Sequence, residues 1–500
     1  MLRFRVFSDG KPADSVDLTG AYLLGSDGVP VRADIEFEDG EIRCNKRAAG
    51  PAGLAIVWPV KDLGRIMLDT TRLPERDKPY LLQLELARSR LMRLSHKQED
   101  WEIDDPKCAE ALTERVAHCR DLLIKALQAD DEVTASRLAD ESLALSIQVA
   151  EDLSLQHAGT GLARRCENGS FGKLLFGCKV DLLSPSETYR KQLAAACDFV
   201  TVPISWRQIE PQEEELNWKP LDSWVEWLAK KRIPMKGSGL VDFTEQNLPD
   251  WLYIWEHDFE RIRDLVYDHI RRVVNRYGQY INTWDVVNGI HATNSISFNF
   301  EQLMELTRMA AAVVKQLLPQ STTIVDMVAP WGEYYARNQR TIPPMLYADM
   351  AIQSGINFDA FGLQFYFGLG LDGMYVRDMF QVSSMIDRFS GRGKPLHITG
   401  VQVPSSTTVD KEDAWGGTVS IDNGGQWRGQ WSEELQSRWL QTFYQIALSK
   451  PAVDTVTWRD LSDTQGHYLP HGGLLRRDLT PKPAYKQLVA MRKKLLGNGR

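Results

Sequence analysis

From about Phe171 to the end of the chain, short apolar runs of β type alternate with amphipathic helical segments, and this alternation most narrows the possible folds. The runs include LLFGCKV, FVTV, NTWDVV, DAFGLQF, LHITGV and DTVTW, and FERIRDLVYDHIRRVVNRYG is one of the helical segments between them. Eight such units over about 320 residues predict a (β/α)8 TIM barrel over residues 173–495. A doubly wound open sheet is the alternative, but no GxGxxG motif follows a run.

The part of the chain before the barrel has two other patterns. Residues 1–75 hold β-type runs such as VRADIEFE and LAIVWPV between turn sequences such as SDG and EDG, which predicts a small sandwich-like β domain. Residues 76–158 carry apolar side chains at three-to-four spacing, which predicts a segment of long helices. Residues 159–172, GTGLARRCENGSFG, are expected to be a linker.

Neither N-terminal region carries a motif that assigns its role. We expect the β domain to cap or dock onto the barrel, with glycan binding as the alternative. The helices of residues 79–157 must bury their apolar faces against one another, against the barrel or against a second subunit. A homo-oligomer formed through these helices is therefore a candidate assembly.

Composition excludes several classes of function. The net charge of −8 gives no electrostatic footprint for nucleic acid or an anionic membrane, and no apolar run is long enough for a membrane span. The N-terminal sequence MLRFRVFSDGKPADS lacks the features of a signal peptide, so a cytoplasmic protein is expected. The six cysteines form no CxxC and the nine histidines no HxH or HExxH, so we predict neither a metal site nor a cofactor.

In a TIM barrel the chemistry belongs to residues at the carboxyl ends of the strands and in the loops that follow. The polar and aromatic residues at such places include Asp242, Asn288, Glu333, Gln364, Tyr366, His397, Trp458, Arg459 and Asp460, with Trp331 and Tyr334 in the same loop as Glu333. Aromatic faces beside carboxylates, amides and guanidinium groups suit a sugar, whose C–H face stacks and whose hydroxyls bond polar tips. The alternative is that individual aromatic residues only pack the barrel.

Several strand-end motifs occur in the order known from one enzyme family. They are WRQIEP (206–211), LPDWL (248–252), TWDVVNG (283–289), GLQFY (362–366), LHITGV (396–401) and LLRRDLTPKPAY (474–485). Over residues 173–495 the chain thus resembles glycoside hydrolase family 10, the retaining endo-β-1,4-xylanases. The resemblance implies a (β/α)8 barrel that acts on a β-linked polysaccharide or oligosaccharide with two glutamates, one as acid/base and one as nucleophile.

The resemblance also places both catalytic glutamates at positions that are glycine here. The acid/base position is Gly289 and the nucleophile position is Gly400. The third-strand motif, GSGLVDF (237–243), lacks the family's histidines and tryptophan, and Tyr366 stands at the family's strand-six histidine. An ordinary retaining xylanase mechanism is therefore not expected.

Two functions are compatible with these departures. The first is hydrolysis of O-glycosidic bonds with noncanonical carboxylates, with Glu333 as candidate acid, Asp242 as candidate base, and a substrate site that includes Asn288, Gln364, Tyr366, His397, Trp458, Trp331 and Tyr334. The alternative for Glu333 is an ion pair with Arg337 or Arg340, or a structural hydrogen bond. The second function is that of an inactive pseudo-glycosidase that binds glycan or serves in assembly. Loss of two carboxylates also favours tolerance of an acidic or sulfated sugar.

Overall fold

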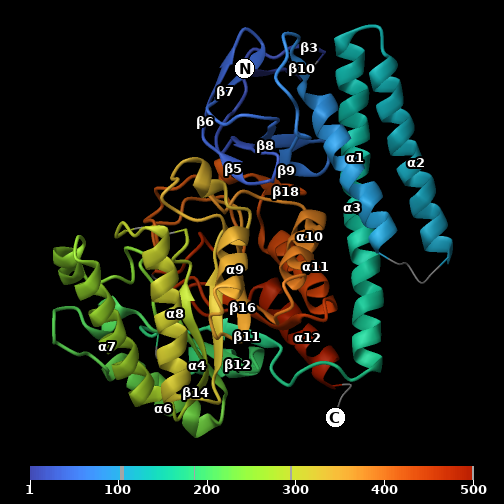
Figure 1. The fold of residues 1–500 in the computed structure, drawn as a ribbon. Helices are drawn as coiled ribbons and strands as arrows, with labels where there is room; N and C mark the ends of the chain where they lie inside the picture. Colours follow the sequence, from blue (N-terminus) through green and yellow to red (C-terminus); the bar gives the residue numbers. More distant parts are fainter. Residues whose placement is uncertain (9, 102–105, 185, 293–294, 465, 498–500) are drawn as a thin grey trace.

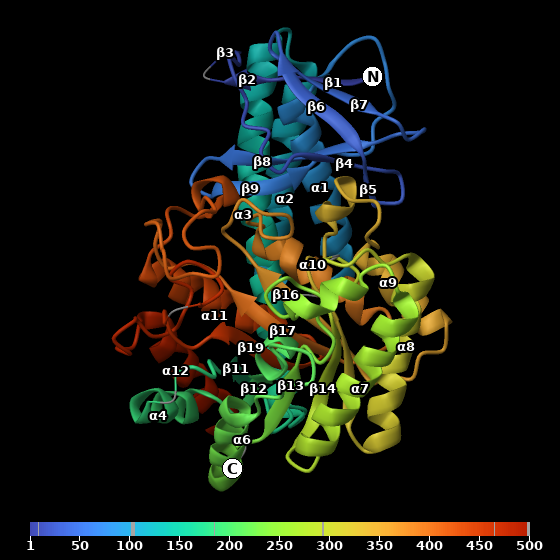
Figure 2. The ribbon, with the colours of Figure 1, turned by 90° about the vertical axis from the view of Figure 1, so that its left-hand side faces the viewer.

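The barrel is closed in the computed structural model, which describes residues 1–8, 10–101, 106–184, 186–292, 295–464 and 466–497. Its strands are β11 (Phe176–Lys179), β12 (Phe199–Pro203), β13 (Met235–Ser238), β14 (Ile281–Asn288), β15 (Thr322–Met327), β16 (Ala360–Tyr366), β17 (Leu396–Gln402) and β19 (Val453–Asp460). Neighbouring strands run parallel, and β11 pairs with β19 to complete the ring. The predicted (β/α)8 fold is confirmed (Figures 1 and 2).

Helices cover the outside of the barrel because each presents an apolar stripe to the strands. They are α4 (Glu187–Ala196), α6 (Lys219–Lys231), α7 (Phe259–Tyr277), α8 (Phe300–Leu317), α9 (Pro344–Gln353), α10 (Met379–Ser390), α11 (Glu433–Ser449) and α12 (Pro483–Gly497). The short helix α5 (Trp206–Ile209) lies in the loop after β12. In α7 the buried stripe includes Ile262, Val266, Ile270 and Val273. Each such side chain contributes about 1.5–3 kcal/mol when it leaves water.

The N-terminal region is β-rich, as its sequence predicts. Its strands are β1 (Leu2–Arg5), β2 (Phe7–Ser8), β3 (Lys11–Pro12), β4 (Tyr22–Leu24), β5 (Pro30–Val31), β6 (Ala33–Glu38), β7 (Glu41–Lys46), β8 (Gly53–Val60), β9 (Gly64–Asp69) and β10 (Tyr80–Leu81). One sheet has the order β10-β1-β7-β6 and the other β18-β9-β8-β4-β5. Strand β18 (Gln426–Trp427) comes from the long loop after β17, so the barrel half of the chain supplies a strand to the N-terminal sheet.

Three long helices follow the N-terminal strands: α1 (Leu82–Asp100), α2 (Pro106–Gln128) and α3 (Glu132–Glu167). Helix α3 packs against α1 and α2 and also against α10 and α11, so it runs from the N-terminal sheets down the side of the barrel (Figure 1). The apolar faces of these helices thus meet one another and the barrel. A homo-oligomer through residues 79–157 stays a prediction. None of the helices among the described residues is long and apolar enough to cross a membrane.

The predicted linker over 159–172 is wrong for most of its length, since α3 continues to Glu167. Arg165 holds this end of the helix, because its guanidinium donates to the carbonyls of Leu448 and Lys450 at 2.8 Å each. Gly161 lets the helix approach closely: a Cβ there would lie 2.9 Å from the carbonyl oxygen of Ser449. The glycine that suggested a flexible segment therefore serves close packing of helix on barrel.

Candidate functional site

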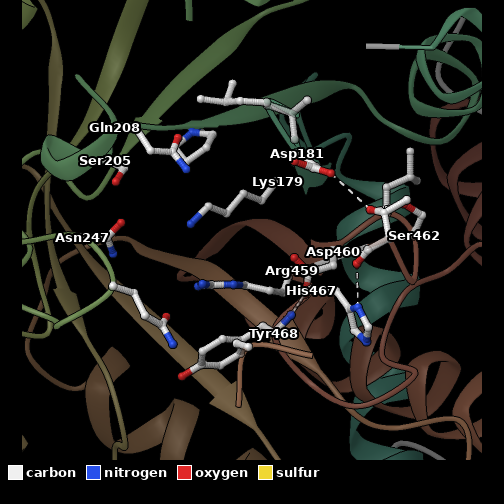
Figure 3. A pocket seen from close by; sticks show the side chains of 18 of the residues that line it. Lys179, Asp181, Ser205, Gln208, Asn247, Arg459, Asp460, Ser462, His467 and Tyr468 are labelled. Atoms are coloured by element: carbon white, nitrogen blue, oxygen red, sulfur yellow. Dashed lines mark hydrogen bonds between the residues drawn. The ribbon is translucent and has the colours of Figure 1, made fainter. Parts of the chain in front are cut away.

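A polar cavity of about 200 Å³ opens at the carboxyl ends of neighbouring strands of the barrel. Lys179 ends β11, Pro203 ends β12 and Asp460 ends β19, and the loops after β13 and β19 complete the wall. Its polar and aromatic lining residues include Lys179, Asp181, Ser205, Gln208, Asn247, Arg459, Asp460, Ser462, His467 and Tyr468 (Figure 3). The cavity thus lies where TIM barrels bind their ligands.

Two cationic side chains reach into this cavity. Figure 3 shows the ends of Lys179 and Arg459 directed toward the space that faces Gln208 and Asn247. Arg459 Nη1 donates to the hydroxyl of Tyr366 at 3.2 Å, and the guanidinium carbon lies 4.2 Å from the centre of the Tyr468 ring. Burial, together with the neighbouring Arg459, lowers the pKa of Lys179 to about 8.

The carboxylates in the wall of the cavity are held by their own loops. Asp181 accepts hydrogen bonds from the backbone N–H of Leu183 at 2.9 Å and from the hydroxyl of Thr464 at 3.2 Å. Asp460 accepts the backbone N–H of Tyr468 at 2.7 Å. These bonds fix both acids as anchors of the loops after β11 and β19 (Figure 3).

A hydrogen-bonded chain joins three of the predicted site residues. Asp242, in the loop after β13, accepts from the amide of Asn288 at 2.7 Å and from that of Asn247 at 2.8 Å. Gln364 donates to Asn288 at 2.7 Å and to Asp326 at 2.7 Å. The structure therefore brings Asp242, Asn288 and Gln364 together, as the strand-end rule predicts, and Asn247 carries the chain to the cavity.

The inside of the barrel also holds buried ionisable groups. Lys236 Nζ lies 2.8 Å from His397 Nδ1 and 2.7 Å from the hydroxyl of Thr455. Burial lowers the pKa of Lys236 to about 7 and raises that of Asp285 to about 6. Burial and the adjacent Lys236 hold the pKa of His397 well below its usual value.

The position of His397 disagrees with its predicted role in substrate binding. His397 is the second residue of β17 (Leu396–Gln402), so it lies near the start of the strand and not at its carboxyl end. The run LHITGV gives no sign of where along the strand its polar residue falls.

Gly289 and Gly400 occupy places that leave no room for a side chain. Gly289 has φ of +60°, and a Cβ there would lie 2.7 Å from Val328 Cγ1. At Gly400 a Cβ would lie 1.9 Å from the hydroxyl oxygen of Tyr366. The backbone conformation at 289 and the Tyr366 ring beside 400 are thus matched to glycine.

Glu333, the predicted acid, is fully buried at 0% exposure under the N-terminal sheet. It accepts from Arg377 Nη2 at 3.2 Å, and the same guanidinium group donates to the hydroxyl of Tyr22 in β4 at 3.2 Å. Arg337 pairs instead with Asp372. Glu333 thus makes a structural hydrogen bond and ion pair, as the alternative to an acid role predicts, but its partner is Arg377 and not Arg337. The pair joins barrel to N-terminal sheet and lies outside the lining of the cavity.

The remaining predicted aromatic residues serve packing. Trp458 is 0% exposed, and its Nε1 donates to the carbonyl of Gly472 at 3.1 Å. The hydroxyl of Tyr334 donates to the carbonyl of Ile342 at 2.8 Å. Trp331 lies under the guanidinium of Arg377, 4.4 Å from ring centre to carbon. These contacts do not place them in the cavity wall, where Tyr468 supplies the aromatic face.

Lys179, Gln208, Asn247 and Tyr468 were missed by sequence reasoning. Lys179 is the last residue of β11, so the strand-end rule applied to the first strand would have selected it. Gln208, Asn247 and Tyr468 lie in α5 and in loops, where no sequence periodicity marks a residue that faces a cavity. Among the residues that the structure describes, no cluster of His, Cys, Asp and Glu side chains is arranged to hold a metal ion.

The sequence profile described as "Glycosyl hydrolase family 10" matches residues 168–491. The chain belongs to this family. The family 10 chain is 22% identical over 293 residues to endo-1,4-beta-xylanase B of Thermotoga neapolitana, covering 56% of this chain and 76% of that protein. It is 30% identical over 122 residues to endo-1,4-beta-xylanase 3 of Hypocrea jecorina, covering 24% and 34% of the two chains.

Solved structures similar to the family 10 chain include two xylanases. Native xylanase 10B from Thermotoga maritima is 19% identical with a TM-score of 0.47, covering 67% of this chain and 98% of that one. Xylanase 10B from Thermotoga petrophila RKU-1, in complex with xylobiose, is 19% identical with a TM-score of 0.46, covering 67% and 96%.

Proposed function

We propose that this family 10 barrel binds a β-linked oligosaccharide in the cavity at its carboxyl end and does not cleave it by the family's two-glutamate route. The observation that carries the proposal is how the fold fills the space at positions 289 and 400, where the resemblance places the two glutamates. Tyr366 occupies the space of any side chain at 400, and a side chain at 289 would meet Val328 in a backbone conformation that favours glycine.

The requirements of the retaining mechanism support binding without cleavage. The mechanism needs two carboxyl groups about 5–5.5 Å apart on either side of the scissile bond, and glycine supplies neither. Of the candidate replacements, Glu333 is buried in its pair with Arg377, and Asp242 accepts hydrogen bonds from Asn247, Asn288 and the backbone of Thr244. Both carboxylates are thus committed to neighbours.

The chemistry of the cavity supports sugar binding. The family 10 relatives are xylanases, and the Thermotoga petrophila enzyme was solved with xylobiose. Amides of Gln208 and Asn247 and the hydroxyl of Ser205 face a space that also meets the Tyr468 ring. Amides and hydroxyls pair with sugar hydroxyls, and an aromatic ring stacks on the C–H face.

The test is calorimetry with a series of xylo-oligosaccharides, paired with mass spectrometry of the same mixtures after long incubation. We expect binding without released product. Gln208→Ala and Tyr468→Ala are expected to weaken binding at least tenfold, because each removes a contact that faces the ligand. Gln339→Ala is the matched control, since Gln339 is exposed and lines a different cavity. Absence of binding across neutral and acidic oligosaccharides would refute the proposal.

Hydrolysis with noncanonical carboxylates is the second candidate function, and the presence of both Asp181 and Asp460 in the cavity wall favours it. Product release in the mass-spectrometric assay would support it, and the anomeric configuration of the first product would then show inversion or retention. Loss of that release in Asp460→Asn, with binding retained, would assign the acid.

A further inference from the structure

Among the described residues, neither cation in the cavity is hydrogen-bonded to a carboxylate. Within the part of the chain that the structure describes, no carboxylate forms an ion pair with Lys179, and Arg459 contacts the hydroxyl of Tyr366 and the ring of Tyr468. The nearby acids are held elsewhere: Asp181 by Leu183 and Thr464, and Asp460 by the backbone of Tyr468, as described above. Positive charge at the centre of the cavity thus lacks a hydrogen-bonded anion.

We propose that the sugar bound in this cavity carries an anionic group, a carboxylate or a sulfate ester, held between Lys179 and Arg459. The inference rests on the proposed binding function and names the class of its ligand. Both side chains come from adjacent strands, since β11 pairs with β19 and Cys178, beside Lys179, lies opposite Trp458, beside Arg459. Lys179 itself is in register with Asp460, across an irregularity in the pairing between Cys178 and Lys179. Paired strands are about 4.8 Å apart, and Figure 3 shows the ends of Lys179 and Arg459 directed into the same space, so one ligand group can meet both.

The electrostatics favour an anion over a neutral hydroxyl at this point. A cation removed from bulk water is costly unless it is paired, and two like charges in one cavity add to that cost. The pKa of Lys179, lowered to about 8 by burial and by Arg459, reflects this cost. A carboxylate or sulfate would accept N–H bonds from both groups, while the amide of Gln208 and the amide oxygen of Asn247 are left for the sugar hydroxyls.

Below pH 8 the Lys179 ammonium is charged, so anion binding is strongest there and weakens as the pH rises through 8. The charged groups that act on Lys179 are Arg459 and Asp460 of β19, Asp242 of the loop after β13 and Asp285 of β14. Asp285, with a pKa of about 6, is ionised throughout the range from pH 7 to 9. Lys236, inside the barrel, has a pKa of about 7 and also loses its proton over this range, so the change is assigned to Lys179 by its loss in the Lys179→Met variant.

The experiment compares three ligands with one xylo-oligosaccharide backbone: unsubstituted, bearing a glucuronic acid unit, and bearing a sulfate ester. Calorimetry at pH 6.5 is expected to show at least tenfold tighter binding of one or both anionic ligands than of the neutral one. The carboxylate and sulfate arms identify which group the cavity selects. The preference should fall when the pH is raised from 7 to 9.

Lys179→Met keeps the length of the side chain and is expected to abolish the preference while neutral binding remains. Lys173→Met, at an exposed position shortly before β11, is the matched control and should retain it. Because Arg459 also supports Tyr366, Arg459→Met is used only with a circular dichroism spectrum that matches the parent. Equal affinity for neutral and anionic ligands would overturn the anionic inference and leave the binding function standing. Failure of all three ligands to bind would overturn the binding function.

Discussion

Replacing Gly400 with alanine puts a methyl carbon where the Tyr366 hydroxyl lies. The new Cβ would stand 1.9 Å from the hydroxyl oxygen and 2.8 Å from the ring carbon that bears it, well inside the ~3.5–4.0 Å of favourable contact. The Tyr366 ring has little space to turn, because it is 6% exposed and its centre lies 4.8 Å from that of Tyr468. Relief requires a shift of strand β16 or β17, or loss of the bond from Arg459.

The cost follows from two contributions. Overpacking of a core by one methyl group costs about 1–3 kcal/mol. Loss of the Arg459–Tyr366 hydrogen bond, which has a charged donor, adds about 1.5–3 kcal/mol. When the clash both overpacks the core and breaks this bond, we therefore expect Gly400→Ala to lower the free energy of unfolding by about 2.5–6 kcal/mol, a large share of the ~5–15 kcal/mol typical of a folded protein.

Urea unfolding followed by tryptophan fluorescence measures this change. Gly159→Ala is the matched control, because Gly159 lies in α3 and a Cβ there meets nothing within 4 Å. That substitution should stabilise the helix by up to about 1 kcal/mol. Gly400→Ala combined with Tyr366→Phe should be less destabilising than the sum of the single changes, since the clashing oxygen is gone. A loss below about 0.5 kcal/mol for Gly400→Ala, or strict additivity, would refute the steric reasoning.

Three further outcomes are expected. Glu333→Gln leaves Arg377 buried without its counter-charge and should lower the free energy of unfolding by about 3 kcal/mol. Calorimetry should show unchanged oligosaccharide binding. Weakened binding in the folded variant would show that Glu333 belongs to the binding site. Burial lowers the pKa of His269 to about 3, so the unfolded chain takes up the proton first as the pH falls. Stability present above pH 6.5 should therefore be lost as the pH falls toward 3. An unchanged slope of unfolding free energy against pH in His269→Gln would contradict this. Arg165→Met should speed amide hydrogen exchange over 159–167, with exposed Arg164→Met as control; equal exchange in the two variants would show that Arg165 does not hold the helix.

The barrel was predictable because the sequence patterns that specify its strands and helices are local and occur eight times. Each strand and helix carries its own periodicity, and the order of elements leaves few ways to close the sheet. The chain Asp242–Asn288–Gln364 was predictable for the same reason, since strand ends meet at one face of a barrel.

The errors have a common physical origin in contacts between distant parts of the chain. Glu333 looks like an accessible loop acid, and only the N-terminal strand that carries Tyr22 shows that it is covered. Gly161 looks like part of a linker, and only Ser449 shows that it is a point of close packing. Lys179 looks like any lysine after an apolar run. Its place in the cavity becomes evident only beside Arg459, which comes from the last strand of the barrel, far along the sequence.

Strand β18 has a consequence for the order in which this protein acquires its structure during synthesis. Gln426 and Trp427 pair with Arg65 and Gly64, so the outer edge of β9 stays open until the ribosome has made the barrel through β17. An open edge is a template for pairing with other chains. Fragments that end before residue 426 are therefore expected to aggregate through β9. A shortened version of the protein should keep the loop of residues 403–432 whenever it keeps the N-terminal strands.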